Sequence, residues 1–244
     1  MPEQYFKHFP TIDFDLKNDG NLIQAKDIFR SIRVQSNADD GITGYEFYQI
    51  QDQDRPDVAA SKLYGDATLY WLFWMVNPHL ATYTDWPKSQ RVLERFIKRK
   101  YSGKALVSQQ QSDIVFSSDS KFFQGEKVVG STSSAFGYVT KIDPTNNQVV
   151  LNDIQGTFQV NETVTGSKSE KSFTLSSVRN FEDSPHHYET SEGLKTSIST
   201  GNTPVSNHDY EQKFNDDKRS IKYIKLQFVP ESVSYTHLTL PTKA

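Results

Sequence analysis

The sequence contains no cysteine among its 244 residues, which excludes disulfide bonds and thiolate chemistry. Its longest uninterrupted apolar run, Leu69–Val76, is far shorter than the ~20 residues that a membrane-spanning helix needs. The net charge of −3 provides no strong field of either sign, so neither nucleic acid nor an anionic membrane is favoured as a partner. The N-terminus lacks the basic flank and apolar region of a secretion signal. We therefore expect a soluble protein that is assembled inside the cell.

Common catalytic and metal-binding motifs are also missing, including glycine-rich phosphate loops, G-x-S-x-G and H-E-x-x-H. His186 and His187 are adjacent, and because neighbouring strand residues point to opposite faces we do not expect them to share a metal. The stretch from Asp13 to Gly20 is similar to a calcium loop, but Lys17 occupies a ligand position and the glycine is misplaced. The sequence thus predicts no catalytic residue, no metal and no cofactor, and we expect that the protein is not an enzyme.

Apolar residues make up only 35% of the chain, whereas aromatic residues reach 13%. This combination favours modest cores or surfaces that meet partners, and it argues against wholesale disorder. The aromatic residues are densest between Tyr48 and Asn77.

That stretch predicts a strand followed by two helices. The alternating segment 45–51 is typical of a strand. Asp52 and Asp54 are possible caps for a first helix, in which Pro56 suits the first turn and Gly65 suits a left-handed C-terminal cap. A second helix over 66–76 should end at Asn77-Pro78, because the residue before a proline resists helical geometry.

The second predicted helix is apolar on every side. One face carries Leu69, Leu72, Phe73 and Val76, and the other sides carry Tyr70, Trp71, Trp74 and Met75. Each aromatic side chain can bury roughly 150–250 Å², which is worth on the order of 4–6 kcal/mol as an upper bound. Since one short helix cannot cover this surface, another part of the chain or another protein must cover the remainder.

Beyond this stretch, 89–101 is typical of an amphipathic helix with Val92, Leu93, Phe96 and Ile97 facing inward. A helix is predicted over 207–218, with Ser206 or Asn207 as its cap. The alternation over 221–229 predicts a strand.

Between these helices lies an internal repeat. The pattern from Phe122 to Ser133 recurs from Phe158 to Ser169, thirty-six residues later, and each copy is typical of strand, turn, strand. A lone hairpin cannot bury its own face, so two copies should close into a small antiparallel barrel or sandwich. Glu126 and Glu162 occupy matching turns, which favours hydrogen bonds to backbone amides over an acid–base pair.

Several motifs in order resemble one family. They are Asp54, Ala59, Leu63-Tyr64-Gly65-Asp66, Leu69, Trp71, Asn77, Asp85-Trp86-Pro87, Lys98-Arg99-Lys100-Tyr101, Tyr210-Glu211, Asn215-Asp216 and Lys218-Arg219-Ser220-Ile221-Lys222. Together they resemble the baseplate wedge proteins of contractile-tailed, T-even-like phages (the gene product fifty-three family), which have a LysM-like core. The resemblance covers 5–101 and returns over 207–229.

The resemblance implies a LysM-like βααβ core with flanking helices, and together with the small antiparallel β barrel or sandwich expected from the repeats, inserted in the wedge body, it gives an α+β fold. We expect an N-terminal arm and wedge core over 1–103, an inserted β module with two repeats over 104–180 and a C-terminal wedge segment over 181–231. Residues 232–244, SVSYTHLTLPTKA, resemble a translated sequencing adaptor, so we expect a non-native tail there.

The resemblance also implies a structural role: joining wedge subunits into the ring around the hub of a phage tail baseplate. The partners would be other wedge proteins and neighbouring wedges, not nucleic acid or membrane, within a virion assembled in the host cytoplasm. Candidate interface residues are aromatic: Tyr5, Phe6, Phe9, Tyr64, Tyr70, Trp71, Trp74 and Trp86. The alternative is a LysM-type peptidoglycan-binding protein, although Gln53-Asp54-Arg55 stands where such modules have Gly-Asp-Thr.

Overall fold

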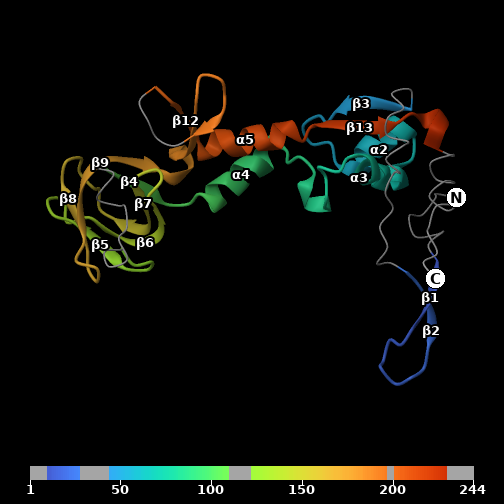
Figure 1. The fold of residues 1–244 in the computed structure, drawn as a ribbon, viewed down its shortest axis with the longest axis horizontal. Helices are drawn as coiled ribbons and strands as arrows, with labels where there is room; N and C mark the ends of the chain where they lie inside the picture. The colour runs from blue at the N-terminus through green and yellow to red at the C-terminus, as the bar shows by residue number, and fades with distance from the viewer. Residues whose placement is uncertain (1–9, 28–43, 110–121, 197–200, 230–244) are drawn as a thin grey trace. The chain divides into compact units, whose positions relative to one another are not determined.

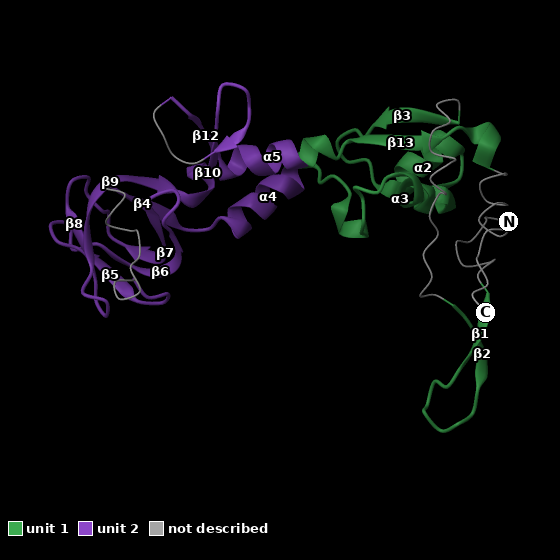
Figure 2. Cartoon of the chain, viewed as in Figure 1, with its two compact units in different colours: residues 1–90, 215–244 green, residues 91–214 purple. Residues whose placement is uncertain are grey.

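The computed structural model describes residues 10–27, 44–109, 122–196 and 201–229. The chain divides into two compact units, residues 1–90 with 215–244 and residues 91–214 (Figure 2). The predicted mixture of helices and strands is confirmed: the described residues form four α-helices and a closed barrel of six strands (Figure 1). No helix in the described ranges is long and apolar enough to cross a membrane.

The first unit is built on a pair of antiparallel strands packed with short helices. In chain order its core elements are β3 (Tyr45–Gln49), α2 (Pro56–Tyr64), the 3-10 helix η1 (Ala67–Tyr70), α3 (Trp71–Val76), the 3-10 helix η2 (Tyr83–Asp85) and β13 (Ser220–Ile224). β3 pairs with β13 in a register that sets Tyr48 opposite Ile221. The chain therefore leaves this unit for the second one and returns to complete the sheet.

The predicted helix boundaries are confirmed in this unit. Pro56 begins α2, and Gly65 ends it with a left-handed φ of 71°, its N–H donating to the Ser61 carbonyl at 3.0 Å. The second helix starts as a 3-10 turn, where the Asp66 carboxylate accepts the Thr68 N–H at 2.8 Å, and it ends before Asn77. Arg55, not Asp52 or Asp54, occupies the N-cap of α2.

Asn77 fastens the end of α3 to β13. Its side-chain amide donates to the Phe73 and Lys222 carbonyls, both at 2.8 Å, and its Oδ1 accepts the Lys222 N–H at 2.8 Å. The side chain thus pairs with both backbone groups of Lys222 as a neighbouring strand would. Because Asn77 is only 2% exposed, these bonds are shielded from water.

The prediction of a strand over 221–229 is wrong beyond Ile224. The paired ladder ends at Ile224, opposite Tyr45, the first residue of β3, and one more backbone bond follows it, from the Lys225 N–H to the Gly44 carbonyl at 3.0 Å. The chain turns into the 3-10 helix η5 (Leu226–Phe228), which leaves Leu226 59% exposed.

The N-terminal part of the first unit carries a separate hairpin of β1 (Thr11–Phe14) and β2 (Ile23–Lys26), which pair antiparallel. These two strands form a sheet of their own. None of the hairpin's described side chains belongs to a hydrophobic core cluster of the described residues.

The helices α4 (Gln90–Lys100) and α5 (Asn207–Asp217), which lie mostly in the second unit, are joined by a polar cluster around the buried Glu211. Glu211 accepts from the Lys100 ammonium at 2.5 Å and from the Tyr101 hydroxyl at 2.9 Å. On α4, Leu93 and Ile97 are buried as predicted, but Val92 is 45% exposed because the buried stripe is narrower than its apolar pattern. Ser206 caps α5, accepting the Asp209 N–H at 3.0 Å.

Six strands between residues 104 and 180 close into a barrel, which decides between the two predicted architectures. Its strands are β4 (Lys104–Ser108), β5 (Lys127–Gly130), β6 (Phe136–Asp143), β7 (Gln148–Gln155), β8 (Thr163–Gly166) and β9 (Ser172–Asn180). Neighbouring strands follow the order β4-β7-β6-β5-β8-β9, and β4 pairs with β9 to close the ring. Beside it, β10 (Pro185–Glu189) pairs with β11 (Lys195–Thr196) and β12 (Thr203–Ser206).

The two repeats are related by an approximate twofold arrangement and hold each other's turns. Val129 of β5 pairs with Thr165 of β8, and these two positions correspond in the repeat. Glu162 accepts the backbone N–H groups of Thr132 and Ser133 at 3.1 and 2.9 Å. Reciprocally, Glu126 accepts those of Lys168 and Ser169 at 3.1 and 3.0 Å.

Each glutamate also accepts an N–H from its own repeat, Phe123 for Glu126 and Gln159 for Glu162, both at 2.7 Å. The preference for backbone hydrogen bonding over an acid–base pair is therefore confirmed, with the addition that most of the bonds cross between repeats. A Cβ at Gly130 would lie 2.6 Å from the Glu162 carboxylate oxygens, so this turn needs glycine.

Candidate protein interface

The predicted interface residues divide into three groups by their place in the fold. Tyr5, Phe6 and Phe9 lie outside the described residues. Tyr64, Trp71 and Trp86 are core residues with exposed fractions of 6%, 9% and 8%. Tyr70 is exposed and Trp74 is half-buried, so these two are the predicted residues that reach the surface.

Two of the core aromatics, Tyr64 and Trp86, pack against Phe73, which is fully buried, and Trp71 belongs to the same core cluster. The Tyr64 ring stacks on the Phe73 ring with centroids 5.7 Å apart. The Trp86 ring packs on Phe73 in a tilted arrangement, with centroids 5.6 Å apart. The Trp86 indole N–H donates to the Asp54 carbonyl at 2.7 Å, and burial raises the pKa of the Tyr64 hydroxyl. These side chains therefore belong to the core beneath the surface that Tyr70 and Trp74 reach.

Most of the apolar surface of α3 is covered by other parts of the same chain. Trp71, Leu72, Phe73 and Val76 are all buried by residues of the same unit, including Ile221 and Ile224 of β13. The uncovered remainder is confined to the side of the helix that carries Tyr70 and Trp74.

That remainder forms an aromatic ledge, which we define as Tyr70, Trp74 and Tyr83. Trp74 is the centre: its ring stacks on Tyr83 at 5.8 Å with an interplanar angle of 12°, and it meets Tyr70 edge-on at 6.0 Å. Tyr70 is 42% exposed and Tyr83 is 62% exposed. Two exposed tyrosine rings that each contact Trp74 thus form one apolar surface with it.

A hydrogen bond and a ring contact to neighbouring residues fix the position of Trp74 in the ledge. The Trp74 indole N–H donates to the Thr82 carbonyl at 3.0 Å, and Trp74 also contacts the buried Trp86 at 5.6 Å. Tyr83 begins η2, whose last residue, Asp85, accepts the Thr82 N–H at 2.8 Å. Hydrogen bonds from Thr82 and the nearby Lys218 ammonium hold the pKa of Asp85 below its usual range, so this anchor is ionised at neutral pH.

Sequence reasoning missed Tyr83. Its neighbours, Thr82 and Thr84, are polar, and nothing in the local pattern marks it as part of an apolar surface. The available signal was its position three residues before Trp86, in the segment that resembles the wedge family.

The carboxylates of Asp52 and Asp54 hold the fold together. Burial opposes ionisation of Asp54, but hydrogen bonds from Lys62 and Tyr48, both 2.6 Å long, outweigh it and lower the pKa of this carboxyl. Asp52 accepts the Gln90 N–H at 2.9 Å and lies 3.6 Å from the Arg219 guanidinium. Asp54 is only 8% exposed, so its carboxylate does not face solvent.

The prediction that His186 and His187 point to opposite faces is wrong. The pairing of β10 with β12 shifts register between Pro185 and His187, and this irregularity breaks the strand alternation. The two Nδ1 atoms lie 3.0 Å apart, and both rings pack on Tyr210, with His186 stacked at 3.7 Å. Among the described residues, no group of three or more His, Cys, Asp or Glu side chains is arranged to hold a metal.

A comparison with family models identifies the protein family of the chain. The model described as base plate wedge protein 53 matches residues 5–156, more than half of the sequence. The chain belongs to this family. A search of curated proteins found no match.

Membership of the wedge family confirms the resemblance seen in the sequence, and it assigns a structural role in the tail baseplate of the phage virion. The matched range contains the whole aromatic ledge, the β1–β2 hairpin and the barrel strands up to β7. β13, which completes the core of the first unit, lies outside that range.

Proposed function

We propose that this wedge-family chain joins wedge subunits into the ring around the baseplate hub, and that it acts by assembly without catalysis. Its partners would be other wedge proteins and neighbouring wedges, with no nucleic acid or membrane involved, and assembly would occur in the host cytoplasm. The observation that carries this proposal is the aromatic ledge: an open apolar surface on a unit whose core is otherwise closed.

The ledge has the properties of an interface anchor. Interface energy is concentrated in a few aromatic or arginine side chains, and immobilising flexible side chains costs affinity. Trp74 is already fixed by its bond to Thr82 and its stacking on Tyr83, so a partner gains contact area with little further ordering. Tyr70 and Tyr83 also offer hydroxyl groups at the rim, where polar contacts suit a wet interface.

We further propose that the first unit is a LysM-like core. β3, α2, the η1–α3 helix and β13 follow the βααβ order, with the two strands antiparallel, although β13 comes from much later in the chain. In this proposal the wedge core and its arm occupy 1–103, the barrel module occupies 104–180, the closing wedge segment occupies 181–231, and 232–244 is a non-native tail.

Peptidoglycan binding remains the rival function, because exposed aromatic rings also stack on sugars. A glycan site needs polar groups that converge beside the rings. The carboxylates at 52–54 are engaged by Lys62, Tyr48 and Gln90, which favours assembly over glycan recognition.

The test combines a ledge variant with a matched control. Tyr70→Ala with Tyr83→Ala removes both exposed rings and leaves the buried core intact. Phe47→Ala is the control, since Phe47 is a still more exposed aromatic of the same unit at 73%. Each variant is co-expressed with the other wedge proteins of the same phage, and rings are counted by electron microscopy.

We expect the double variant to fold but to lose most rings, and Phe47→Ala to assemble like the wild type. Normal ring formation by the double variant would refute the role of the ledge. A pulldown on purified peptidoglycan distinguishes the two functions. Specific retention of the wild type that the double variant abolishes would favour glycan binding, whereas no retention of the wild type favours assembly.

A further inference from the structure

The β1–β2 hairpin sorts its residues completely by face. In its register Ile12 lies opposite Ala25, and Phe14 lies opposite Ile23. Directly opposed residues of an antiparallel pair project to the same side, and alternate residues share a face. One face of the hairpin is therefore wholly apolar.

The other face is wholly polar, with Thr11 opposite Lys26 and Asp13 opposite Gln24. Such alternation is typical of a sheet that covers a hydrophobic core with one side and meets water with the other.

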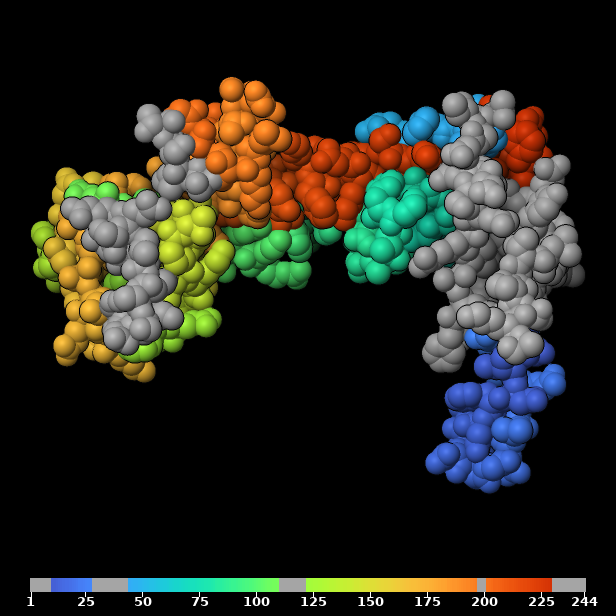
Figure 3. Space-filling model, in the orientation of Figure 1, coloured from blue at the N-terminus to red at the C-terminus, as the bar shows by residue number. Residues whose placement is uncertain are grey.

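The apolar face is nevertheless open. Phe14 is 41% exposed and Ile23 is 48% exposed, and they are extended at the tip by Leu16 at 68% and Leu22 at 65% (hairpin in blue, Figure 3). An isolated two-stranded hairpin is at best marginally stable in water, and three strands or a packed face are needed for independent stability. A hairpin that sorts its faces and leaves the apolar one open is built to be covered.

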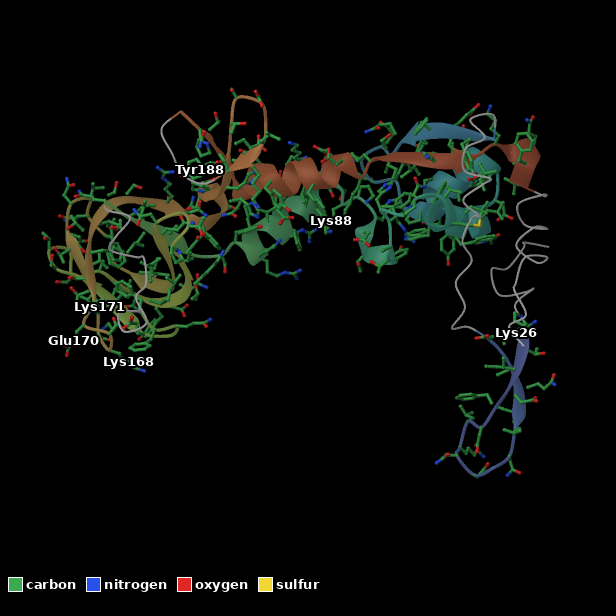
Figure 4. The ribbon with its side chains drawn as sticks, in the orientation of Figure 1. Lys26, Lys88, Lys168, Glu170, Lys171 and Tyr188 are labelled. Carbon is green, nitrogen blue, oxygen red and sulfur yellow. The ribbon has the colours of Figure 1, made fainter. Side chains whose placement is uncertain are left out.

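The hairpin is also acidic. Between Pro10 and Asp27 the sequence has four aspartates and two lysines, one of them Lys26, labelled in Figure 4. At the tip, the Asp15 carboxylate accepts the Gly20 N–H at 2.7 Å and the Asp19 N–H at 3.1 Å. The loop that joins the strands is thus preformed around a carboxylate, and the hairpin as a whole carries a net negative charge.

We propose that this hairpin docks its apolar face onto an apolar surface with a basic rim on another protein of the baseplate. The identity of the partner as a baseplate protein rests on the proposed function. The charge of the hairpin argues against a second copy of this chain, because two hairpins meeting face to face would bring like charges together. This contact is separate from the aromatic ledge and uses different residues.

The test compares two double variants on the same hairpin. Phe14→Ser with Ile23→Ser makes one opposed pair of the apolar face polar. Thr11→Ser with Gln24→Ser changes the polar face by as many residues without changing charge. Both full-length variants are co-expressed with the wedge proteins of the same phage and purified through a tag on this chain, and the co-purified proteins are quantified.

We expect the apolar-face variant to lose one co-purified baseplate protein by at least about tenfold, while the polar-face variant retains it. Retention is expected to fall as salt rises and with Asp13→Lys, because both weaken attraction to a basic rim. Thermal unfolding followed by tryptophan fluorescence should match the wild type, since Trp71 and Trp86 lie in the core of the first unit, Trp74 packs against that core, and none of the three lies in the hairpin.

Equal co-purification by both variants would overturn the proposal. So would a homodimer of the wild type that the apolar-face variant converts to monomer, because the occupant would then be a second copy. If ledge variants abolish assembly while hairpin variants do not, the hairpin inference fails and the proposed function stands. If the wild type co-purifies no wedge protein at all, both fail.

Discussion

The reciprocal glutamates of the barrel support a quantitative prediction. Glu162 is 4% exposed, and its two oxygens accept three backbone N–H groups and the Ser133 hydroxyl. Glu162→Gln keeps the shape but turns one oxygen into an NH₂ donor, which faces N–H donors. The amide can keep its oxygen at the position of Oε2, so one backbone N–H group, that of Gln159, loses its acceptor, and at about 1–3 kcal/mol for a buried unsatisfied group we expect a loss of roughly 1–3 kcal/mol of barrel stability.

The matched control is Glu170→Gln, which makes the same chemical change on an exposed residue in the turn between β8 and β9 (Figure 4). We expect the control to change stability by less than about 0.5 kcal/mol. The assay is hydrogen exchange followed by mass spectrometry on peptides from 122–180, with tryptophan fluorescence as an internal reference for the first unit, which contains Trp71, Trp74 and Trp86.

The pH dependence of this difference follows from the pKa of Glu162. Burial would raise that pKa, but hydrogen bonds from Ser133 and Gln159 outweigh it and lower the pKa below the ordinary 4.5. A lowered folded-state pKa contributes stability that is present above 4.5 and is lost as the pH falls through the folded-state value. The gap between wild type and Glu162→Gln should therefore narrow in acid. If Glu162→Gln and Glu170→Gln exchange alike at neutral pH, the reciprocal lock contributes nothing and the reasoning is wrong.

Two further predictions concern backbone contacts. Gly130→Ala should destabilise the barrel by about 1–3 kcal/mol, because its Cβ would lie 2.6 Å from the Glu162 carboxylate; unchanged hydrogen exchange would contradict this. Asn77→Ala should destabilise the first unit by on the order of 3 kcal/mol, because both backbone groups of Lys222 lose a buried partner. Urea unfolding followed by tryptophan fluorescence measures this loss, with the exposed Asn21→Ala as control; equal midpoints would refute the role of Asn77.

Much of the local structure could be predicted because its causes are local. Pro56 and Gly65 mark the two ends of α2 through their own backbone preferences, and the residue types in the two repeats predict their turns. The failures occurred where a distant segment decides the outcome. β13 ends at the residue that pairs with the first residue of β3, and the two histidines share a side because the pairing of β10 with β12 shifts register between Pro185 and His187.

The candidate site shows the same division. The pattern of 66–76 identified a helix with too much apolar surface, but it could not tell Trp71 from Trp74, since both are tryptophans on one short helix. The packing of β13 and Trp86 decides that Trp71 is enclosed and that Trp74 joins Tyr70 and Tyr83 at the surface.

By itself, the sequence determined the family, the helix boundaries of the first unit and the existence of two matched repeats, because these depend on residue types and on spacings of a few positions. Only the tertiary structure decided which aromatics remain exposed, that the repeats close into a barrel, and that each glutamate holds the turn of the other repeat. Exposure and long-range pairing depend on which segments come together in space, and no local pattern encodes that.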